Sequence, residues 1–307
     1  MRTFTFKGLL LTAVFMLLGC LSIQAANDDL ITKQITIKLD KAGTLPDRIA
    51  SSKKYKITNL KIVGEINGTD WNMIREMAGR NYQESSTEGN LSVLDLSEAK
   101  IVAGGDYYYY DNLFNNKVYT SNDEIGEYAF AYCSGLTSLT LPVGITSIGE
   151  FAFSGCSGLT SLTLPAGITS IDKYAFSGCS RLTSLTLPAG ITWIGESAFS
   201  YCSGLTSIYV YAEKVPRIGR YAFEGCASRK CTLYVPKGTY DNYRLSEFGY
   251  FENIVEFDAT GIDKTTTSTD VEEVSRYSLN GQRLVGPTKG LNIVKYSDGS
   301  VKKVAVE

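Results

Sequence analysis

Histidine is absent from this chain of 307 residues, and only two tryptophans and four methionines are present. Without histidine, the chain lacks the usual general base at neutral pH and the most common ligand of metal ions in proteins. The GK[ST] phosphate loop, the GxSxG nucleophile elbow and the HExxH zinc helix are also missing, and no two cysteines have CxxC spacing. We therefore expect a protein that is not an enzyme and that uses neither a cofactor nor a metal ion.

An excess of charge of either sign is missing too, since 30 basic residues face 32 acidic ones and the formal net charge is −2. Such a balanced surface has no general field that would attract nucleic acid or an anionic membrane. We therefore expect no nucleic-acid partner, and contact with a membrane only through a lipid or surface anchor.

Long apolar runs are missing apart from one near the start of the chain. Residues 8–18 are apolar, follow the basic residues Arg2 and Lys7, and form a run too short to cross a bilayer. This arrangement is typical of a secretory signal peptide, which we place at residues 1–25.

The same segment contains an alternative processing site. The sequence Leu17-Leu18-Gly19-Cys20 resembles a lipobox, in which Cys20 would be lipidated and would become the N-terminus. In either case we expect export from the cytoplasm, to the cell surface and outer membrane or into the medium.

What the sequence has in abundance is an internal repeat with a period of 23 residues. Each copy carries an isoleucine, an AF pair and a cysteine at fixed distances, followed by a strand-like run such as LTSLTL. This self-similarity is typical of a solenoid, in which one unit cannot bury its apolar face without its neighbours. The five copies begin at Ile125, Ile148, Ile171, Ile194 and Ile218.

Two periodicities lie within each copy. Ile125, Ala129, Phe130 and Cys133 have spacings that place them on one face of a short helix. Leucines then alternate with hydroxyl residues over 136–141, which is typical of a strand that ends at the following proline and glycine. We therefore expect each copy to add one short helix and one strand of a parallel sheet.

The repeat pattern IGxxAFxxCxxLTSLxLPxGIT resembles the BspA-like, or Treponema-type, leucine-rich repeat of bacterial surface proteins. The resemblance covers residues 125–236. It implies a curved right-handed solenoid and attachment to host proteins, host cells or other bacteria.

The rest of the chain divides around this region. We expect an α/β leucine-rich-repeat solenoid with a parallel sheet and short helices, capped at both ends and followed by a small antiparallel β tail. The expected boundaries are 1–25 for the signal peptide, 26–124 for the N-terminal cap and degenerate repeats, 125–236 for the five repeats, 237–258 for the C-terminal cap, 259–270 for a threonine-rich linker and 271–307 for the tail.

The N-terminal cap contains one segment with a helical pattern and three with the inward spacing of a repeat strand. Residues 70–78 predict an amphipathic helix that buries Trp71, Ile74 and Met77, with Thr69 as its capping residue. The strand-like segments are centred on Ile35, Ile37 and Leu39, on Ile57, Leu60 and Ile62, and on Leu91, Leu94 and Leu96.

The C-terminal cap, residues 237–258, predicts a closing helix and strand. The side chains expected to cover the last repeat are Tyr240, Tyr243, Phe248, Phe251 and Ile254.

In the tail, the dipeptides Asn280-Gly281 and Asp298-Gly299 favour two-residue hairpins. Together with Gly290 and the lysine-rich last strand, they resemble the C-terminal sorting domain of type IX secretion cargo. The resemblance implies a sorting signal, although a small β tail without that role would have the same pattern.

The repeat cysteines occupy one position per copy and should therefore stack in a column inside the solenoid. A buried free thiol behaves as a small apolar side chain, and parallel Cβ directions are poor for a disulfide. Cys231 lies off this column near Cys226, so a local bridge between these two is an alternative to free thiols.

Two groups of side chains are candidates for binding a ligand. Hydroxyl residues at the outward strand positions should form rows on the sheet face, and Tyr209, Tyr211 and Tyr234 replace them in the last two repeats. The second group, Tyr107, Tyr108, Tyr109 and Tyr110, lies in the loop 104–122. Tyrosine gives contact area at little cost in conformational entropy, as in antibody paratopes. The alternatives are that hydroxyls merely suit exposed strands and that the loop packs over the junction of cap and repeats.

These observations lead to one functional hypothesis and one alternative. We expect an exported, non-enzymatic cell-surface protein that binds a protein partner, as an adhesin does, through the sheet face and the tyrosine-rich loop. The alternative is a carbohydrate-binding accessory protein of the cell surface.

Overall fold

The structure is a computed structural model that describes residues 30–259, 273–278, 282–284, 290–296 and 301–306. The predicted signal peptide with Cys20, most of the linker, and the dipeptides Asn280-Gly281 and Asp298-Gly299 lie outside the described residues.

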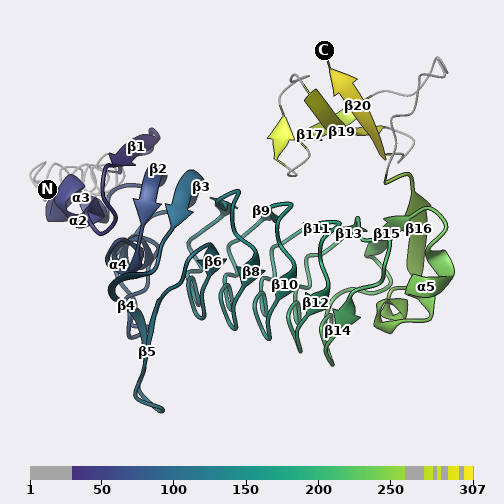
Figure 1. The fold of residues 1–307 in the computed structure, drawn as a ribbon, viewed down its shortest axis with the longest axis horizontal. Coiled ribbons are helices and arrows are strands. Elements are labelled where there is room, and N and C mark those ends of the chain that lie inside the picture. Colours follow the sequence, from purple (N-terminus) through teal and green to yellow (C-terminus); the bar gives the residue numbers. More distant parts are fainter. Residues whose placement is uncertain (1–29, 260–272, 279–281, 285–289, 297–300, 307) are drawn as a thin grey trace, which may run out of the picture.

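The repeats stack into a leucine-rich-repeat solenoid, as predicted. One short strand from each repeat joins a parallel ladder along one side of the body, which we call the primary ladder (Figure 1). Its strands are β1 (Ile35–Leu39), β2 (Asn59–Ile66), β3 (Val93–Ile101), β7 (Ser138–Thr140), β9 (Ser161–Thr163), β11 (Ser184–Leu187), β13 (Ser207–Val210), β15 (Thr232–Pro236) and β16 (Asn253–Phe257). The ladder consists of two paired runs, β1 to β9 and β11 to β16, and the Thr183 amide connects them by donating to Thr160 O at 3.4 Å.

The register of the primary ladder places equivalent leucines on top of one another. Leu94 pairs with Leu139, and Leu139 pairs with Leu162. These side chains are buried, so each rung adds its apolar residues to one continuous core. The alternation predicted for residues 136–141 is therefore confirmed, and so are the three strand-like segments of the N-terminal cap.

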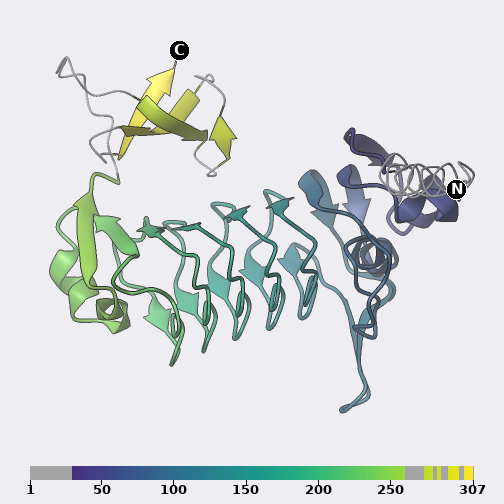
Figure 2. The same ribbon diagram turned by 180° about the vertical axis from the view of Figure 1, so that it is seen from behind.

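The opposite side of each repeat contains turns and a two-residue strand, so the predicted short helix is wrong. The short strands pair in parallel and form a secondary ladder along the other side of the body (Figures 1 and 2). Its strands are β6 (Glu124–Ile125), β8 (Ser147–Ile148), β10 (Ser170–Ile171), β12 (Trp193–Ile194) and β14 (Arg217–Ile218).

Hydrogen bonding explains why these segments are not helical. The amides of Tyr128 and Phe130 donate to carbonyls of the next repeat, Glu150 O at 2.9 Å and Ala152 O at 2.6 Å. The amide of Ala129 instead donates within its own repeat, to Gly126 O at 3.3 Å. Alternate amides thus bind the neighbouring repeat, whereas in an α-helix every amide would donate four residues back along its own chain.

Two left-handed backbone positions in each repeat also exclude a helix. Tyr128 has φ of +54° and Tyr132 has φ of +59°, and the equivalent residues of the later repeats have positive φ as well. A right-handed helix cannot continue through such residues. The residues predicted to point inward are buried, because a series of turns satisfies their spacing as well as a helix does.

Two columns of side chains fill the core between the ladders. The rings of Phe130, Phe153, Phe176, Phe199 and Phe223 stack in sequence, with 4.9–5.5 Å between successive centroids. The repeat cysteines form the second column, and the six described cysteines are all free and buried. The buried-thiol prediction is therefore confirmed, and Cys226 and Cys231 form no bridge.

The thiol column also makes contacts that a purely apolar side chain could not make. Cys156 Sγ donates to Phe130 O at 3.0 Å, and Cys179 Sγ donates to Phe153 O at 3.3 Å. The same bond links Cys202 to Phe176 and Cys226 to Phe199. Each of these four thiols therefore ties its repeat to the phenylalanine of the preceding repeat.

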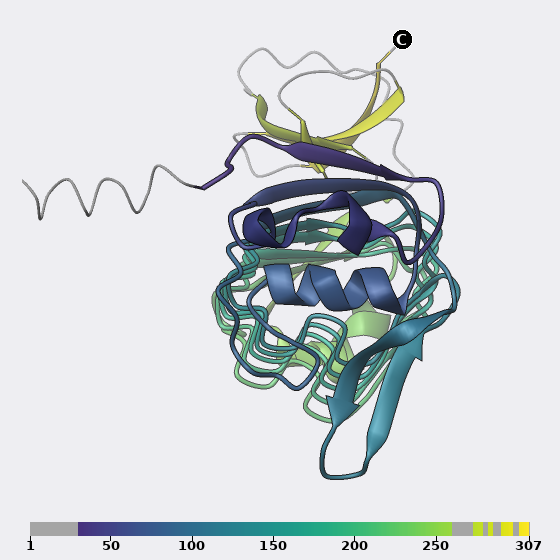
Figure 3. The same cartoon turned by 90° about the vertical axis from the view of Figure 1, so that its left-hand side faces the viewer.

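The N-terminal cap places a helix across the open end of the core (Figure 3). Helix α4 (Gly68–Met77) buries Trp71, Ile74 and Met77, as predicted. Its capping residue is Asn67 rather than Thr69, because the Asn67 side chain accepts the Thr69 amide and Asp70 binds back to the Asn67 amide. Two one-turn helices, α2 (Leu45–Arg48) and α3 (Ser51–Lys54), complete the cap.

The cap supplies the hydrogen-bond donors that a preceding repeat would otherwise supply. Ala129 O is equivalent to Ala152 O, which accepts an amide from the repeat before it. In the first repeat, Trp71 Nε1 and Arg75 Nη1 donate to Ala129 O, each at 3.0 Å. Arg75 is completely buried and also donates to Tyr128 O. Its guanidinium thus donates to main-chain carbonyls at the N-terminal end of the repeat stack.

The C-terminal cap consists of α5 (Tyr240–Arg244), the 3-10 helix η1 (Glu247–Tyr250) and β16. Tyr243, Phe248 and Phe251 are buried against the last repeat, and Ile254 is partly buried. The prediction that Tyr240 also covers the core is wrong, since 41% of this residue is exposed at the start of α5.

The tail forms a separate antiparallel sheet in the order β18, β17, β19, β20. The described parts of its strands pair as two hairpins would require. The strands are β17 (Glu273–Ser278), β18 (Arg283–Leu284), β19 (Gly290–Tyr296) and β20 (Val301–Val306).

The thiol column predicts a loss of stability at alkaline pH. Burial raises the pKa of Cys133 to about 11 from an ordinary value of 9.0. Above pH 9 the unfolded chain releases this proton while the folded chain keeps it, so the free energy of unfolding should fall with rising pH. We expect Cys133→Ala to remove about 1.4 kcal/mol per pH unit from this slope between pH 9 and 11, measured by urea unfolding.

A reactivity measurement gives the control for this prediction. At pH 8 the column thiols should resist a water-soluble disulfide reagent in the folded protein and react fully in urea. Rapid labelling of the folded protein at several column positions would contradict the burial of these thiols.

Candidate functional site

The outward side chains of the primary ladder form two parallel rows of hydroxyls, which we call the ladder face. Ser138 pairs with Ser161 and Thr140 with Thr163, so each row continues from one repeat to the next. Ser207 Oγ donates to Ser184 Oγ at 3.1 Å, which joins neighbouring rungs directly. The predicted rows are therefore present.

A third set of hydroxyls, just before the strands, is used within the fold. Thr160 Oγ1 donates to Thr137 O at 3.0 Å, and Thr206 Oγ1 donates to Thr183 O at 3.0 Å. These threonines hold consecutive rungs together. The serine and threonine rows on the strands themselves are the ones that can meet a ligand.

Tyrosines replace the hydroxyls at the C-terminal end of the ladder face. The rings of Tyr209 and Tyr234 stack in parallel, with centroids 4.4 Å apart. Tyr211 meets the ring of Phe257 edge-on at 5.1 Å. Burial raises the pKa of Tyr211 to about 12, and burial followed by the proximity of Tyr234 raises the pKa of Tyr209 well above its usual value. These tyrosines therefore form a preformed, half-buried aromatic cluster.

The antiparallel tail sheet lies above this end of the ladder face (Figures 1 and 2). Lys303 Nζ lies 5.2 Å from the centre of the Tyr211 ring, a cation–π contact. A cleft of about 680 Å³ separates the two sheets, with ladder-face hydroxyls on one wall and Tyr277, Ile293 and Lys295 on the other. Tyr209 and Tyr211 of the cluster thus line a cleft rather than an open surface.

The tyrosine-rich loop is a β-hairpin, formed by β4 (Gly104–Asp111) and β5 (Asn116–Thr120), that projects from the body (Figures 1 and 3). Tyr108 and Tyr109 are buried, which removes both from the candidate ligand-binding residues. Tyr108 donates to Glu127 O at 2.8 Å, and Tyr109 stacks on Tyr128 at 4.1 Å. These two residues anchor the root of the hairpin to the first repeat.

The other two tyrosines of the loop remain partly accessible. Tyr107 packs edge-on against Tyr82 at 5.3 Å and beneath the Lys117 ammonium group. Tyr110 donates to Asn115 Oδ1 at 2.7 Å and so braces the turn. Both rings are half-buried, and they stiffen the hairpin as well as lining its sides.

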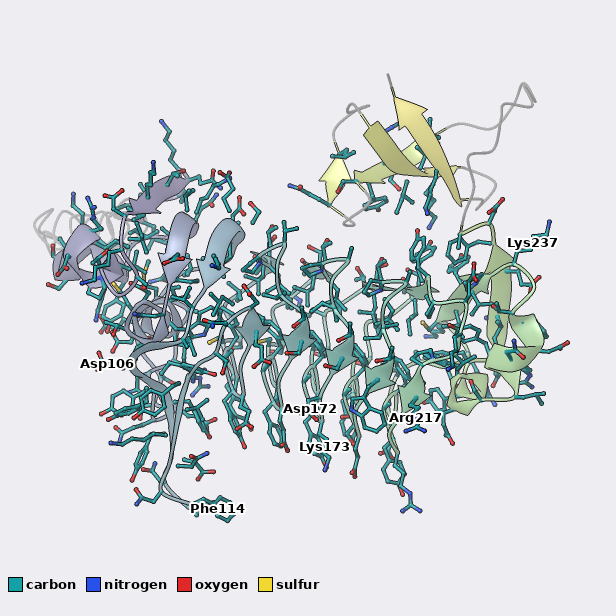
Figure 4. All side chains as sticks on the ribbon, viewed as in Figure 1. Asp106, Phe114, Asp172, Lys173, Arg217 and Lys237 are labelled. Carbon is teal, nitrogen blue, oxygen red and sulfur yellow. The ribbon has the colours of Figure 1, made fainter. Side chains whose placement is uncertain are left out.

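The tip of the hairpin presents two apolar side chains that the sequence did not single out as candidates. Leu113 is 89% exposed and Phe114 is 81% exposed. Asp111 Oδ1 accepts the amides of both, at 2.8 and 3.2 Å, so the tip is an ordered turn. Figure 4 shows Phe114 at the far end of the hairpin, away from the core. The available signal was an apolar pair after an acidic turn residue, which is weaker than the run of tyrosines beside it.

Within the described residues, no three acidic, cysteine or histidine side chains cluster as metal ligands would. No helix in the same part of the chain is long and apolar enough to span a bilayer.

Comparison with known protein families identifies the repeats. Residues 104–235 match the model described as "BspA type Leucine rich repeat region", in six copies. This is one copy more than the five that the spacing predicted, and the match begins upstream of Ile125, at the hairpin. The leucine-rich-repeat class and the BspA type of the repeats are thus confirmed. No match is found among curated proteins.

Solved structures of bacterial leucine-rich-repeat proteins are similar to parts of the chain. A Treponema pallidum leucine-rich-repeat protein is 30% identical over 45% of this chain and 64% of its own, with a TM-score of 0.37. A Bacteroides ovatus leucine-rich-repeat protein is 29% identical over 38% of this chain and 37% of its own, with a TM-score of 0.30. A leucine-rich cell surface protein from Faecalibacterium prausnitzii is 25% identical over 62% of this chain and 52% of its own, with a TM-score of 0.33. The chain therefore spans less than two thirds of each of these proteins.

We expect substitutions at the root and at the tip of the hairpin to differ greatly in their effect on the free energy of unfolding. Tyr108→Ala should lower the free energy of unfolding by about 3–5 kcal/mol, because it empties a buried site. Phe114→Ser should change it by less than about 0.5 kcal/mol, because the ring is exposed. Urea unfolding of both variants tests the pair, and a large cost at Phe114 would mean that the tip packs against the body.

Proposed function

We propose that this protein is an exported, non-enzymatic surface protein that binds a protein partner through the ladder face and the hairpin. The observation that carries the proposal is a rigid ladder face whose aligned hydroxyl rows end in the stacked rings of Tyr209 and Tyr234. Hydrogen bonds between rungs hold this face in one conformation, so a segment of the partner that enters the cleft beneath the tail sheet would bind with little loss of conformational entropy in this chain. BspA-type repeats make up most of the region that forms this face.

The hairpin supplies the second contact in this proposal. Exposed aromatic and aliphatic side chains that fill a partner's pocket dominate the energetics of many protein interfaces. Leu113 and Phe114 are held at the end of a braced turn, so they reach a partner without first being ordered. Half-buried Tyr107 and Tyr110 flank the approach to that tip.

Export and surface attachment form part of the same proposal. Their support is the signal-like pattern of residues 1–25, the lipobox-like sequence ending at Cys20 and the sorting-domain resemblance of residues 271–307. These features fit three alternatives: cleavage of the signal peptide, lipidation of Cys20, and sorting through the tail.

Binding to immobilised host matrix proteins and mucin tests the function, with biolayer interferometry as the readout. We expect retention of the full chain by at least one of these surfaces. The double variant Leu113→Ser/Phe114→Ser should weaken binding at least about tenfold, a loss of about 1.4 kcal/mol. Tyr209→Ala with Tyr234→Ala should weaken it by a similar factor.

Two controls separate binding from folding. Tyr221→Ala removes an exposed ring on the turn side of the repeats and should leave the affinity unchanged. Tyr209→Phe keeps the stacked ring, and so checks that loss in the alanine variant is not loss of the fold. Equal affinity in all of these variants, or no retention by any protein surface, would refute the proposal.

A further inference from the structure

A second recess lies on the opposite side of the body from the ladder face. It is a groove of about 410 Å³ between hairpin strand β5 and the secondary ladder. Figure 4 shows Asp172, one of its lining residues, on the side of the repeats toward which the hairpin projects. Neither the ladder face nor the hairpin tip takes part in it.

Two exposed aromatic rings line the groove, one from the hairpin and one from the secondary ladder. Tyr119 comes from the hairpin and is 48% exposed, and Trp193 comes from β12 and is 37% exposed. Along the secondary ladder, Glu124 pairs with Ser147, Ser147 with Ser170, and Ser170 with Trp193. Three rung spacings of about 4.8 Å separate Glu124 from Trp193, or about 14 Å. The part of the groove that runs along the secondary ladder is therefore long enough for an elongated molecule.

The floor and sides of the groove are polar. Ser147 and Ser170 line the groove with small hydroxyl side chains. Glu124, Glu127 and Asp172 add hydrogen-bond acceptors, and the exposed amide of Asn116 adds a donor. Such a lining suits a ligand that is rich in hydroxyl groups.

Two departures from the repeat pattern meet in this groove. Trp193 occupies the position of Ser147 and Ser170 in the two preceding repeats, and the first and last copies hold Glu124 and Arg217 there. Asp172 occupies the position of Gly149 and Gly195, where the main chain of the preceding repeat lies within 3 Å of an added Cβ. Stacking of the repeats needs neither substitution, because the neighbouring copies stack without them. Both side chains nevertheless line the same recess.

We propose that this groove is a binding site for a neutral oligosaccharide. The rings of Trp193 and Tyr119 would pack on the apolar faces of sugar rings, and the serines, carboxylates and Asn116 would bind the sugar hydroxyls. The secondary-ladder strands β8 and β10 are paired on both sides and offer no free edge to a peptide, whereas β5 is paired only with β4, so an extended peptide on the edge of β5 is the competing ligand that the test must separate. This site is separate from the proposed protein-binding surface, and the sugar-binding proposal does not depend on that surface.

The chain has a built-in probe for this test. Trp71 is buried and Trp193 is exposed, and they are the only two tryptophans in the sequence. The full chain is applied to a microarray of neutral oligosaccharides, and each bound sugar is then titrated in solution. We expect binding of at least one oligosaccharide of several units, with a change in tryptophan emission.

Substitutions that restore the repeat pattern identify the site without endangering the fold. Trp193→Ser and Asp172→Gly introduce residues that neighbouring repeats already hold at these positions, and each should weaken sugar binding at least about tenfold. Tyr201→Gly is the matched control. It restores the glycine found at 155 and 178, which have the same positive φ, but it lies outside the groove, so the affinity should not change.

Each other outcome overturns the proposal. It fails if no neutral oligosaccharide binds, or if binding survives both Trp193→Ser and Asp172→Gly. Capture of peptides, but not sugars, in a Trp193-dependent manner would assign the groove to a different ligand. Trp193→Ser should leave retention by protein surfaces intact, so failure here is distinguishable from failure of the ladder-face proposal.

Discussion

Hydrogen bonding between successive repeats is the constraint on which the rest of the structure depends. On the turn side, the amides of Tyr128 and Phe130 donate to the next repeat, and on the strand side the amides of Thr160 and Thr183 donate to the preceding one. Buried carbonyls without a donor are costly, so a stack of this kind cannot simply stop. The cap therefore aims Trp71 and Arg75 at Ala129 O. At the other end, Tyr243 donates to Ala212 O at 2.6 Å.

Much of the fold follows from periodicity alone. A fixed spacing of leucines, phenylalanines and cysteines can be satisfied only by stacking, so the ladder, the ring column and the buried thiols were predictable. The main-chain path on the turn side was not. Tyr128, Phe151 and Tyr174 adopt left-handed conformations that aromatic residues rarely take, and their rings stack on one another 4.8–5.0 Å apart. Only the assembled stack offers that compensation.

The candidate sites were less predictable, because they depend on contacts between distant segments. The hydroxyl rows follow from strand alternation, but the tail sheet above Tyr211 does not. Four consecutive tyrosines indicated that some would be exposed, and burial of Tyr108 and Tyr109 depends on the first repeat and the α4 cap. Arg75 lies on the apolar side of α4, where its charge gave no hint that it meets the orphan carbonyls of the stack.

Near-identical repeats also make deviations informative. A side chain that every copy shares serves the stack, whereas one that varies between copies is free to serve another purpose. On this reasoning the tyrosines of the last two rungs and the Trp193–Asp172 pair mark two surfaces on opposite sides of one rod. The core beneath them is the same, so the surfaces can differ in ligand without any change in fold.

Deletion of one whole repeat, Gly149–Ile171, tests the central claim that the rungs are interchangeable units held by repeat-to-repeat hydrogen bonds. Because the deletion keeps every register, the shortened chain should unfold in one cooperative transition, with a urea m-value lower by about a tenth. A matched deletion of half a repeat, Gly149–Leu159, should abolish that transition. Loss of cooperative unfolding in the whole-repeat deletion, or its survival in the half-repeat deletion, would contradict the account.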